Sequence, residues 1–394
     1  MRLLLLAHDL GLYGGVGTAS YELAEALPKM GVEVLVIAKH NNNFTGNTAG
    51  FHIHMLHSPE IPPRDIIFYL SNIHAVTDIV KRFRPDAIHD VSGGIQFLPW
   101  LSRYAPVVVT VHGSPLLDDI RTLYSSLHDW IRFRLYQYSH YIPAKLMSLL
   151  IKADIKRFVF VSKTCLADTL VRLELKTRYI LKAKSTVIYN GLSLERIRSI
   201  IKVSNQNFNR YDIVFAGRLM EYKGVDRLIR AFSHVVKEIH EARLHIVGLG
   251  PEYNKLRLLA KKLDLERRVI FHGWLHRDRA LKLISSSALL AHPSLYESFG
   301  YVVAEAYALG KPVVAHKAPY SKELVDEVGA GLVVNTFIEE TFSDALLALL
   351  VDNNLYKKLS SRAYEVAGSL FNIHTTAKKY VEVYESVVKG GDIH

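Results

Sequence analysis

The sequence alternates short apolar runs with longer segments of helical spacing, and this pattern occurs twice. In the first half the runs lie at 3–7, 34–38, 86–91, 107–111 and 158–161, each short enough for one buried strand. A polar stretch at 202–210 follows, and the pattern restarts with runs at 212–216, 244–247, 269–271, 288–291, 313–315 and 332–334. Strands that alternate with helices form a parallel sheet with helices on both faces. The chain is therefore predicted to form two doubly wound, Rossmann-like α/β domains.

The length of the chain agrees with this division, since 394 residues suffice for two or three domains. We expect an N-terminal domain over 1–190 and a C-terminal domain over 191–373. The last 50 residues are helical in pattern and contain no candidate strand. Ligands of such sheets bind at the carboxyl ends of the strands, so functional side chains are expected there.

Two features favour a cytoplasmic protein. Cys165 is the single cysteine, which excludes an intramolecular disulfide and fits a reducing compartment. The apolar run at 3–7 is too short for a signal peptide or a membrane span. These observations lead to the expectation of a cytoplasmic chain.

The formal net charge of +11 is concentrated in one stretch. Residues 121–184 contain 13 Lys and Arg against four acids, and 121–157 is also rich in aromatic side chains. A basic, aromatic, helix-like segment can lie on an anionic membrane surface or bind an anionic acceptor. It can equally be a solvated helix face whose aromatic side chains lie in the core. Both interpretations stay open, and the first would make the protein peripherally membrane-associated.

An acidic pair follows the run at 288–291. Glu297 is predicted in a loop between a strand and a helix, and Glu305 inside that helix, which stops at Gly310. A helix N-terminus offers unpaired N–H groups and a positive dipole, so it binds anions. Two acids around it suit an elongated ligand with phosphate in the middle and hydroxyl groups at both ends. The alternative is an ordinary turn with a surface Glu297 and a half-buried Glu305.

Two cations stand at the end of the first strand of the second domain. Arg218 and Lys223 lie five residues apart in a loop that closes on Gly224. Together they could neutralise a departing diphosphate without a metal ion. The alternative is a solvated loop with incidental charges.

Other sequence signals exclude several classes. The His residues form no Cys/His cluster at metal-ligand spacing, so no metal and no cofactor are expected. No P-loop motif and no nucleic-acid-binding module is present. The segment Gly15-Val16-Gly17-Thr18-Ala19-Ser20 is close to the dinucleotide fingerprint but has Ser20 at the third glycine position. It supports a backbone that approaches a ligand at a helix start.

Six short motifs, in their order along the chain, resemble the retaining GT-B-fold glycosyltransferases of family 4. They are Gly14-Gly15, Val111-His112-Gly113, Tyr189-Asn190-Gly191, Gly217-Arg218-Leu219 with Lys223-Gly224, Val247-Gly248-x-Gly250-Pro251, and Glu297-x7-Glu305. The resemblance covers essentially the whole chain. It is specific for the family and does not specify the sugars.

The resemblance implies a hexosyltransferase that moves a sugar, with retention, from a nucleotide-diphosphate sugar to a hydroxyl of a lipid, saccharide or small-molecule acceptor. It implies that Arg218 and Lys223 bind the diphosphate, that Glu305 binds the ribose, and that Glu297 and His112 lie near the sugar. The last helix, about 374–388, would return to the N-terminal domain, which would bind the acceptor. The further donor contacts would be Gly15, Gly17, Gly248, Gly250, Gly273, Phe299, Gly300 and Tyr301.

The sequence departs from the family pattern at two places. Asn190-Gly191 is followed by Leu192-Ser193, so the usual Asp is absent. The Gly-Gly-x-x-Glu commonly found after the Pro-Val-Val strand is replaced by residues 316–323, His-Lys-Ala-Pro-Tyr-Ser-Lys-Glu. The second departure leaves the choice of sugar open.

Three other classes compete with this prediction. A nucleotide-sugar epimerase or phosphorylase on the same fold would turn over the donor without an acceptor or require inorganic phosphate. A non-catalytic sugar-nucleotide binder would show no hydrolysis. A nucleic-acid binder, suggested only by the basic charge, would show salt-dependent binding and no donor turnover.

Overall fold

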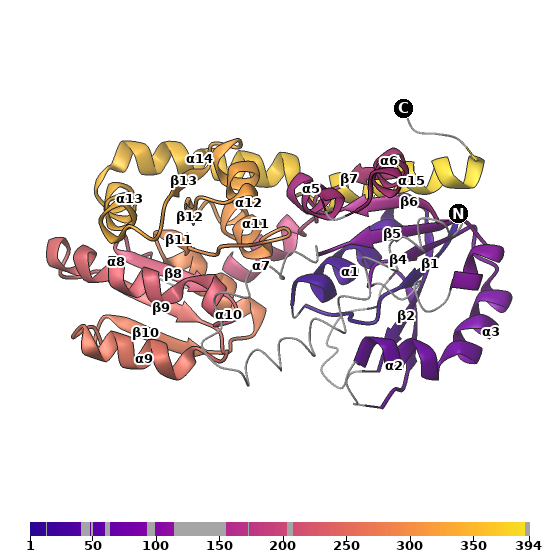
Figure 1. Ribbon diagram of the computed structural model, residues 1–394, viewed down its shortest axis with the longest axis horizontal. Helices are drawn as coiled ribbons and strands as arrows, with labels where there is room; N and C mark the ends of the chain where they lie inside the picture. Colours follow the sequence, from indigo (N-terminus) through magenta and orange to yellow (C-terminus); the bar gives the residue numbers. More distant parts are fainter. Residues whose placement is uncertain are drawn as a thin grey trace. The chain divides into compact units, whose positions relative to one another are not determined.

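A computed structural model describes residues 1–12, 14–40, 48, 50–59, 64–92, 99–113, 155–171, 173–202 and 208–390. The chain divides into two compact units (Figure 1). Unit 1 comprises 1–191 and 373–394, and unit 2 comprises 192–372. Most of the basic aromatic segment, up to residue 154, lies outside the described residues.

Unit 1 is built on a seven-stranded sheet in the order β3-β2-β1-β4-β5-β6-β7, and every pairing in it is parallel. Its strands are β1 (Arg2–Leu6), β2 (Glu33–Lys39), β3 (His52–Leu56), β4 (Ala87–Asp90), β5 (Val107–Val111), β6 (Ile155–Phe160) and β7 (Ser185–Val187). Its helices are α1 (Gly15–Ala26), η1 (Leu27–Met30), α2 (Arg64–Ser71), α3 (Ile73–Phe83), η3 (Pro99–Arg103), α5 (Lys163–Val171), α6 (Leu175–Ala183) and α15 (Ile373–Lys389). The predicted parallel α/β architecture is confirmed.

The sequence prediction was wrong at two elements of unit 1. It omitted β3, because this edge strand alternates exposed histidines with half-buried apolar residues and so lacks a continuous apolar run. It also omitted the helix α2, which spans Arg64–Ser71 and ends just before α3 begins at Ile73.

The last helix, α15, belongs to unit 1 and packs on α1, β4 and β6. Its Ala377, Tyr380, Val383 and Tyr384 lie in the same hydrophobic core as the strand residues of β1 and β2. Apolar side chains of this size each contribute about 1.5–3 kcal/mol on full burial. The helix therefore completes the core of unit 1 although it is distant in sequence.

A buried polar cluster also holds α15 in place. His89 in β4 has one ring nitrogen 2.7 Å from the Thr110 hydroxyl and the other 2.7 Å from the Tyr384 hydroxyl. The Tyr380 hydroxyl lies 2.9 Å from the same Thr110 oxygen. Burial, with a smaller effect of His112, lowers the pKa of His89 to about 3. His89 is therefore neutral in the folded chain at physiological pH.

This cluster predicts a pH-dependent stability. The unfolded chain takes up a proton on His89 below pH 6.5 and the folded chain does not, so the stabilisation is complete above pH 6.5 and is lost as the pH falls toward 3. When the pH falls from 6.5 to 5, the protonation of His89 in the unfolded chain should lower the free energy of unfolding by about 2 kcal/mol. Urea unfolding at both pH values should show this loss in the wild type and a smaller loss in His89→Gln. Equal losses would contradict it.

Unit 2 is built on a six-stranded parallel sheet in the order β10-β9-β8-β11-β12-β13. Its strands are β8 (Asp212–Ala216), β9 (Arg243–Val247), β10 (Val269–Gly273), β11 (Leu289–His292), β12 (Val313–His316) and β13 (Gly331–Val334). Its helices are α7 (Leu194–Lys202), η5 (Glu221–Lys223), α8 (Val225–Glu238), α9 (Tyr253–Lys262), α10 (Arg277–Ser286), α11 (Tyr301–Ala308), α12 (Pro319–Ser321), η6 (Lys322–Asp326), α13 (Glu339–Val351) and α14 (Asn353–Leu370). All six strands predicted here are confirmed.

Helix α8 shows how the local sequence builds this unit. Leu228, Ile229, Phe232 and Val235 recur at helical spacing and are fully buried on one face. They join the strand residues of β8 and β9 in one core. Because α8 starts directly after the loop that carries Lys223, its packing fixes that loop at the edge of the sheet.

Candidate active site

The candidate active site of unit 2 lies at the carboxyl ends of its strands. The loop after β8 carries Arg218 and Lys223, and the loop after β11 carries Glu297. The two strands are neighbours in the sheet, so their carboxyl ends are adjacent. The Leu295 amide donates a hydrogen bond to the Tyr222 carbonyl over 2.8 Å, which joins the two loops directly.

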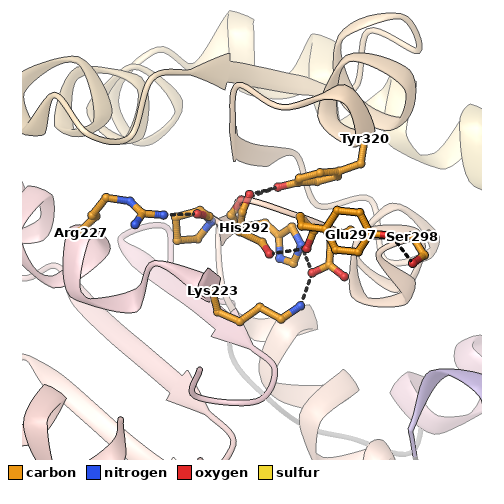
Figure 2. Close-up of polar contacts among 9 residues, drawn as sticks. Lys223, Arg227, His292, Glu297, Ser298 and Tyr320 are labelled. Atoms are coloured by element: carbon orange, nitrogen blue, oxygen red, sulfur yellow. Dashed lines mark hydrogen bonds and ion pairs between the residues drawn. The ribbon is translucent and has the colours of Figure 1, made fainter. Parts of the chain in front are cut away.

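Lys223 and Glu297 form an ion pair at this edge (Figure 2). The Lys223 ammonium contacts Oε1 of Glu297, and His292 Nε2 lies 2.9 Å from the same oxygen. The side chains of Lys223, Glu297 and His292 are only 13%, 15% and 2% exposed. Glu297 is thus a buried, paired carboxylate, and the alternative of an ordinary surface Glu297 is wrong.

The pair fixes the charges of both groups. Burial favours neutral forms, but the Lys223 ammonium and His292 outweigh it and lower the pKa of Glu297 to about 2. Burial likewise opposes the Lys223 charge, and the Glu297 carboxylate reverses this and raises the pKa of Lys223. Both side chains are charged at physiological pH. Arg218 is exposed, and its positive charge partly offsets this rise in the pKa of Lys223.

The loop of Glu297 leads into α11 as predicted. Gly300 precedes the helix with φ of 71°, a left-handed conformation that favours glycine. No side-chain hydrogen bond caps α11 and its first turn holds no acid. The Phe299 side chain is buried against Phe371 and Tyr301, so only its backbone can meet a ligand. This helix end therefore keeps the anion-binding character expected from sequence.

Glu305 lies inside α11 and carries a partner that the sequence prediction omitted. Arg277, the first residue of α10, donates from Nε to Glu305 Oε1 over 2.7 Å. The two side chains are 8% and 14% exposed. The position of Arg277 just after β10 could have indicated it, because that strand end meets the same edge of the sheet. Glu305 is therefore held by an arginine as well as by its helix.

The glycines after β9 allow a close approach between backbone segments. A Cβ at Gly248 would lie 1.8 Å from the Gly217 carbonyl oxygen, and one at Gly250 would lie 2.2 Å from that of Leu219. Gly248 also has φ of 132°, and its amide donates to the Gly273 carbonyl over 2.7 Å. These glycines let three loops pack backbone against backbone.

The other predicted residues lie in unit 1. Gly15 is the first residue of α1, and Gly17 follows with its Cβ position 3.2 Å from the Gly11 carbonyl oxygen. His112 comes directly after β5, and burial lowers its pKa to about 4. Its Nε2 is buried and has no hydrogen-bond partner among the described residues. His112 therefore presents a neutral imidazole at physiological pH.

Within the part of the chain that the structure describes, no group of three or more His, Cys, Asp or Glu side chains is arranged to hold a metal ion. No helix in the same part is both long and apolar enough to cross a bilayer.

The chain matches two family models. The family model for glycosyltransferase family 4 matches residues 13–196, and the model for glycosyl transferases group 1 matches residues 197–366. The chain belongs to the family 4, or group 1, glycosyltransferases. This glycosyltransferase is 24% identical over 375 residues to an alpha-monoglucosyldiacylglycerol synthase of Streptococcus pneumoniae, covering 91% of the chain and 80% of that protein.

Other relatives match over shorter stretches. An uncharacterized glycosyltransferase of Methanocaldococcus jannaschii is 28% identical over 208 residues, which cover 51% of this glycosyltransferase and 53% of the relative. An N-acetyl-alpha-D-glucosaminyl L-malate synthase of Bacillus anthracis is 28% identical over 177 residues, which cover 45% and 46%. The chain thus matches about half the length of these two relatives.

Solved structures show the same fold. Anabaena Alr3699/HepE in complex with UDP-glucose superposes with a TM-score of 0.72 at 20% identity, over 98% of this glycosyltransferase and 100% of that chain. A sucrose-phosphate synthase of Thermosynechococcus elongatus has a TM-score of 0.74 at 19% identity, over 99% and 100%. The predicted GT-B fold is confirmed.

Proposed function

We propose that this glycosyltransferase moves a hexosyl group, with retention, from a nucleoside-diphosphate sugar to an acceptor hydroxyl. The buried Lys223–Glu297 pair beside the N-terminus of α11 carries the proposal. It combines a cation for a diphosphate, a carboxylate for sugar hydroxyls and a helix end for phosphate oxygens in one place. The UDP-glucose bound by the Anabaena neighbour agrees with such a donor.

We assign the main donor roles to residues of unit 2. Arg218 and Lys223 neutralise the diphosphate, and Glu297 accepts hydrogen bonds from the sugar. Glu305, held by Arg277, binds the ribose hydroxyls. The remaining donor contacts of unit 2 are the backbone at Phe299, Gly300 and Tyr301 and the glycines at 248, 250 and 273.

The chemical step in this proposal needs no metal. The bond between the anomeric carbon and the diphosphate oxygen breaks, and the acceptor oxygen forms its bond on the same face. The departing diphosphate takes the proton of the acceptor hydroxyl, while Arg218 and Lys223 stabilise its growing charge. Glu297 stays ionised and holds the sugar, so catalysis consists of positioning and electrostatic stabilisation.

The acceptor is proposed to be a lipid or saccharide hydroxyl. The Streptococcus pneumoniae relative, which matches 91% of this chain, is an alpha-monoglucosyldiacylglycerol synthase, and this name supports a lipid acceptor. The basic aromatic segment 121–157 would then contact an anionic membrane surface from the cytoplasmic side, which makes the enzyme a peripheral membrane protein.

A thermal-shift screen tests the donor proposal. A nucleotide sugar at about a hundred times its Kd should stabilise the fold by about 2.7 kcal/mol. For a unit of this size the shift corresponds to about 5–10 °C. UDP-, GDP- and ADP-sugars should be compared with the free sugars as controls. A shift with one nucleotide series is expected; none with any series would contradict the proposal, and turnover that requires inorganic phosphate would favour a phosphorylase.

A further inference from the structure

Three consecutive backbone carbonyls at the start of the Glu297 loop accept hydrogen bonds from side chains (Figure 2). The Tyr320 hydroxyl donates to the carbonyls of His292 and Ser294 over 3.2 and 2.9 Å. Arg227 donates from its guanidinium to the Pro293 carbonyl between them over 2.7 Å. The chain is thus held from two elements, α12 and α8, at the point where it leaves β11.

Tyr320 is itself fixed. It is 1% exposed, and its ring meets the His292 ring edge-on at 5.7 Å. A hydroxyl has one hydrogen, so the two carbonyls share a single donor. The short helix α12 ends at Ser321, and the hydroxyl of this serine donates to the His316 carbonyl over 2.5 Å. The donor therefore comes from a rigid support.

Arg227 is fixed by a second chain of contacts. Its Nε donates to the Thr336 hydroxyl over 3.1 Å, and that hydroxyl lies 2.9 Å from His316 Nδ1. The guanidinium also lies over the Phe337 ring, 4.5 Å from its centre. These contacts orient the arginine so that its Nη2 reaches the Pro293 carbonyl.

The three carbonyls lie close in sequence to Glu297 of the Lys223–Glu297 ion pair. His292 lies 2.9 Å from Glu297 Oε1, and its own carbonyl is one of the three. A second bond, from the Ser294 hydroxyl to the Tyr296 carbonyl over 2.8 Å, stiffens the loop just before Glu297. A shift of this segment would move Glu297, which holds the sugar in the proposed function, together with His292, which contacts its carboxylate.

We infer that Tyr320 and Arg227 are positioning residues, which hold the loop 292–297 so that Glu297, supported by His292, meets the donor sugar. The inference rests on the proposed function. It also gives a role to the segment 316–323, where the sequence departs from the family pattern and which supplies both Tyr320 and His316. These side chains act on the sugar half of the donor through the backbone and need not touch it.

Tyr320→Phe tests the inference against a matched control. Tyr307→Phe also removes one fully buried tyrosine hydroxyl from a backbone carbonyl, that of Leu324 in η6 at 2.9 Å. Each variant loses one buried hydrogen bond, so both should lose similar thermal stability. The probe is whichever of UDP-glucose, UDP-N-acetylglucosamine and GDP-mannose the wild type hydrolyses fastest, together with its free nucleoside diphosphate.

Tyr320→Phe should lower kcat about tenfold or more while the Kd of the free nucleoside diphosphate stays within about twofold, because only the sugar side is misplaced. Tyr307→Phe should keep both values near wild type. Arg227→Lys, which keeps the charge and loses the oriented fork, should behave like Tyr320→Phe. Equal kinetics in the two tyrosine variants would overturn the inference alone. A wild type that hydrolyses none of the donors would overturn the proposed function and the inference with it.

Discussion

Replacing Lys223 by methionine should lower kcat for sugar transfer at least about a hundredfold, the loss typical when one donor to a developing oxyanion is removed. The substitution removes a cation from the proposed diphosphate site. It also leaves the Glu297 carboxylate buried beside it without its main counter-charge, so the pKa of Glu297 should rise. Steady-state kinetics with the donor found by thermal shift measure the effect.

Two controls make this result specific. Lys255→Met removes a lysine of the same unit whose pairing with Glu252 is exposed, and it should leave kcat unchanged. Arg218→Ala should resemble Lys223→Met, since both cations are assigned to the diphosphate. Near-normal turnover in Lys223→Met or Arg218→Ala would contradict the assigned roles.

Gly248→Ala should be the most destabilising single change at the site. The added Cβ would lie 1.8 Å from the Gly217 carbonyl oxygen, and φ of 132° is strained for any L side chain. Overpacking and backbone strain together should cost about 3 kcal/mol or more. Thermal unfolding should then occur about 10 °C lower. The loop that carries Arg218 would also have to move.

Gly368→Ala is the matched control for this change. Gly368 lies in α14 with nothing within 4 Å of its Cβ position. Alanine there should be neutral or stabilise the protein by up to about 1 kcal/mol. An unfolding midpoint of Gly248→Ala close to that of Gly368→Ala would show that the loops after β8 and β9 are not packed as described.

The parts of the fold that depend on local sequence were predictable. Glu297 lies in the loop after β11 and Glu305 in α11, as the apolar run before them and Gly310 after them indicated. The edge strand β3 was missed because two of its five residues, both histidines, are exposed and interrupt the apolar pattern. Periodicity identifies strands that are buried on both faces far more readily than edge strands.

The contacts within the site depend on tertiary packing. Lys223 and Glu297 are 74 residues apart, and no local rule indicates that the cation assigned to the diphosphate touches the carboxylate assigned to the sugar. Tyr320 and Arg277 were missed for the same reason, since each meets its partner only through the packing of elements that are distant in sequence. Gly248 and Gly250 were expected to approach a ligand, and the structure shows that they approach the backbone of Gly217 and Leu219.

The most direct test of the account is proton NMR of the donor's anomeric signal during turnover. With an α-linked nucleotide sugar, the wild type should consume the donor signal and release the α-anomer of the sugar first, before it equilibrates in water. Lys223→Met should show neither change on the same timescale. Release of the β-anomer first would contradict retention, and an unchanged donor signal in the wild type with every nucleotide sugar would contradict glycosyl transfer by this site.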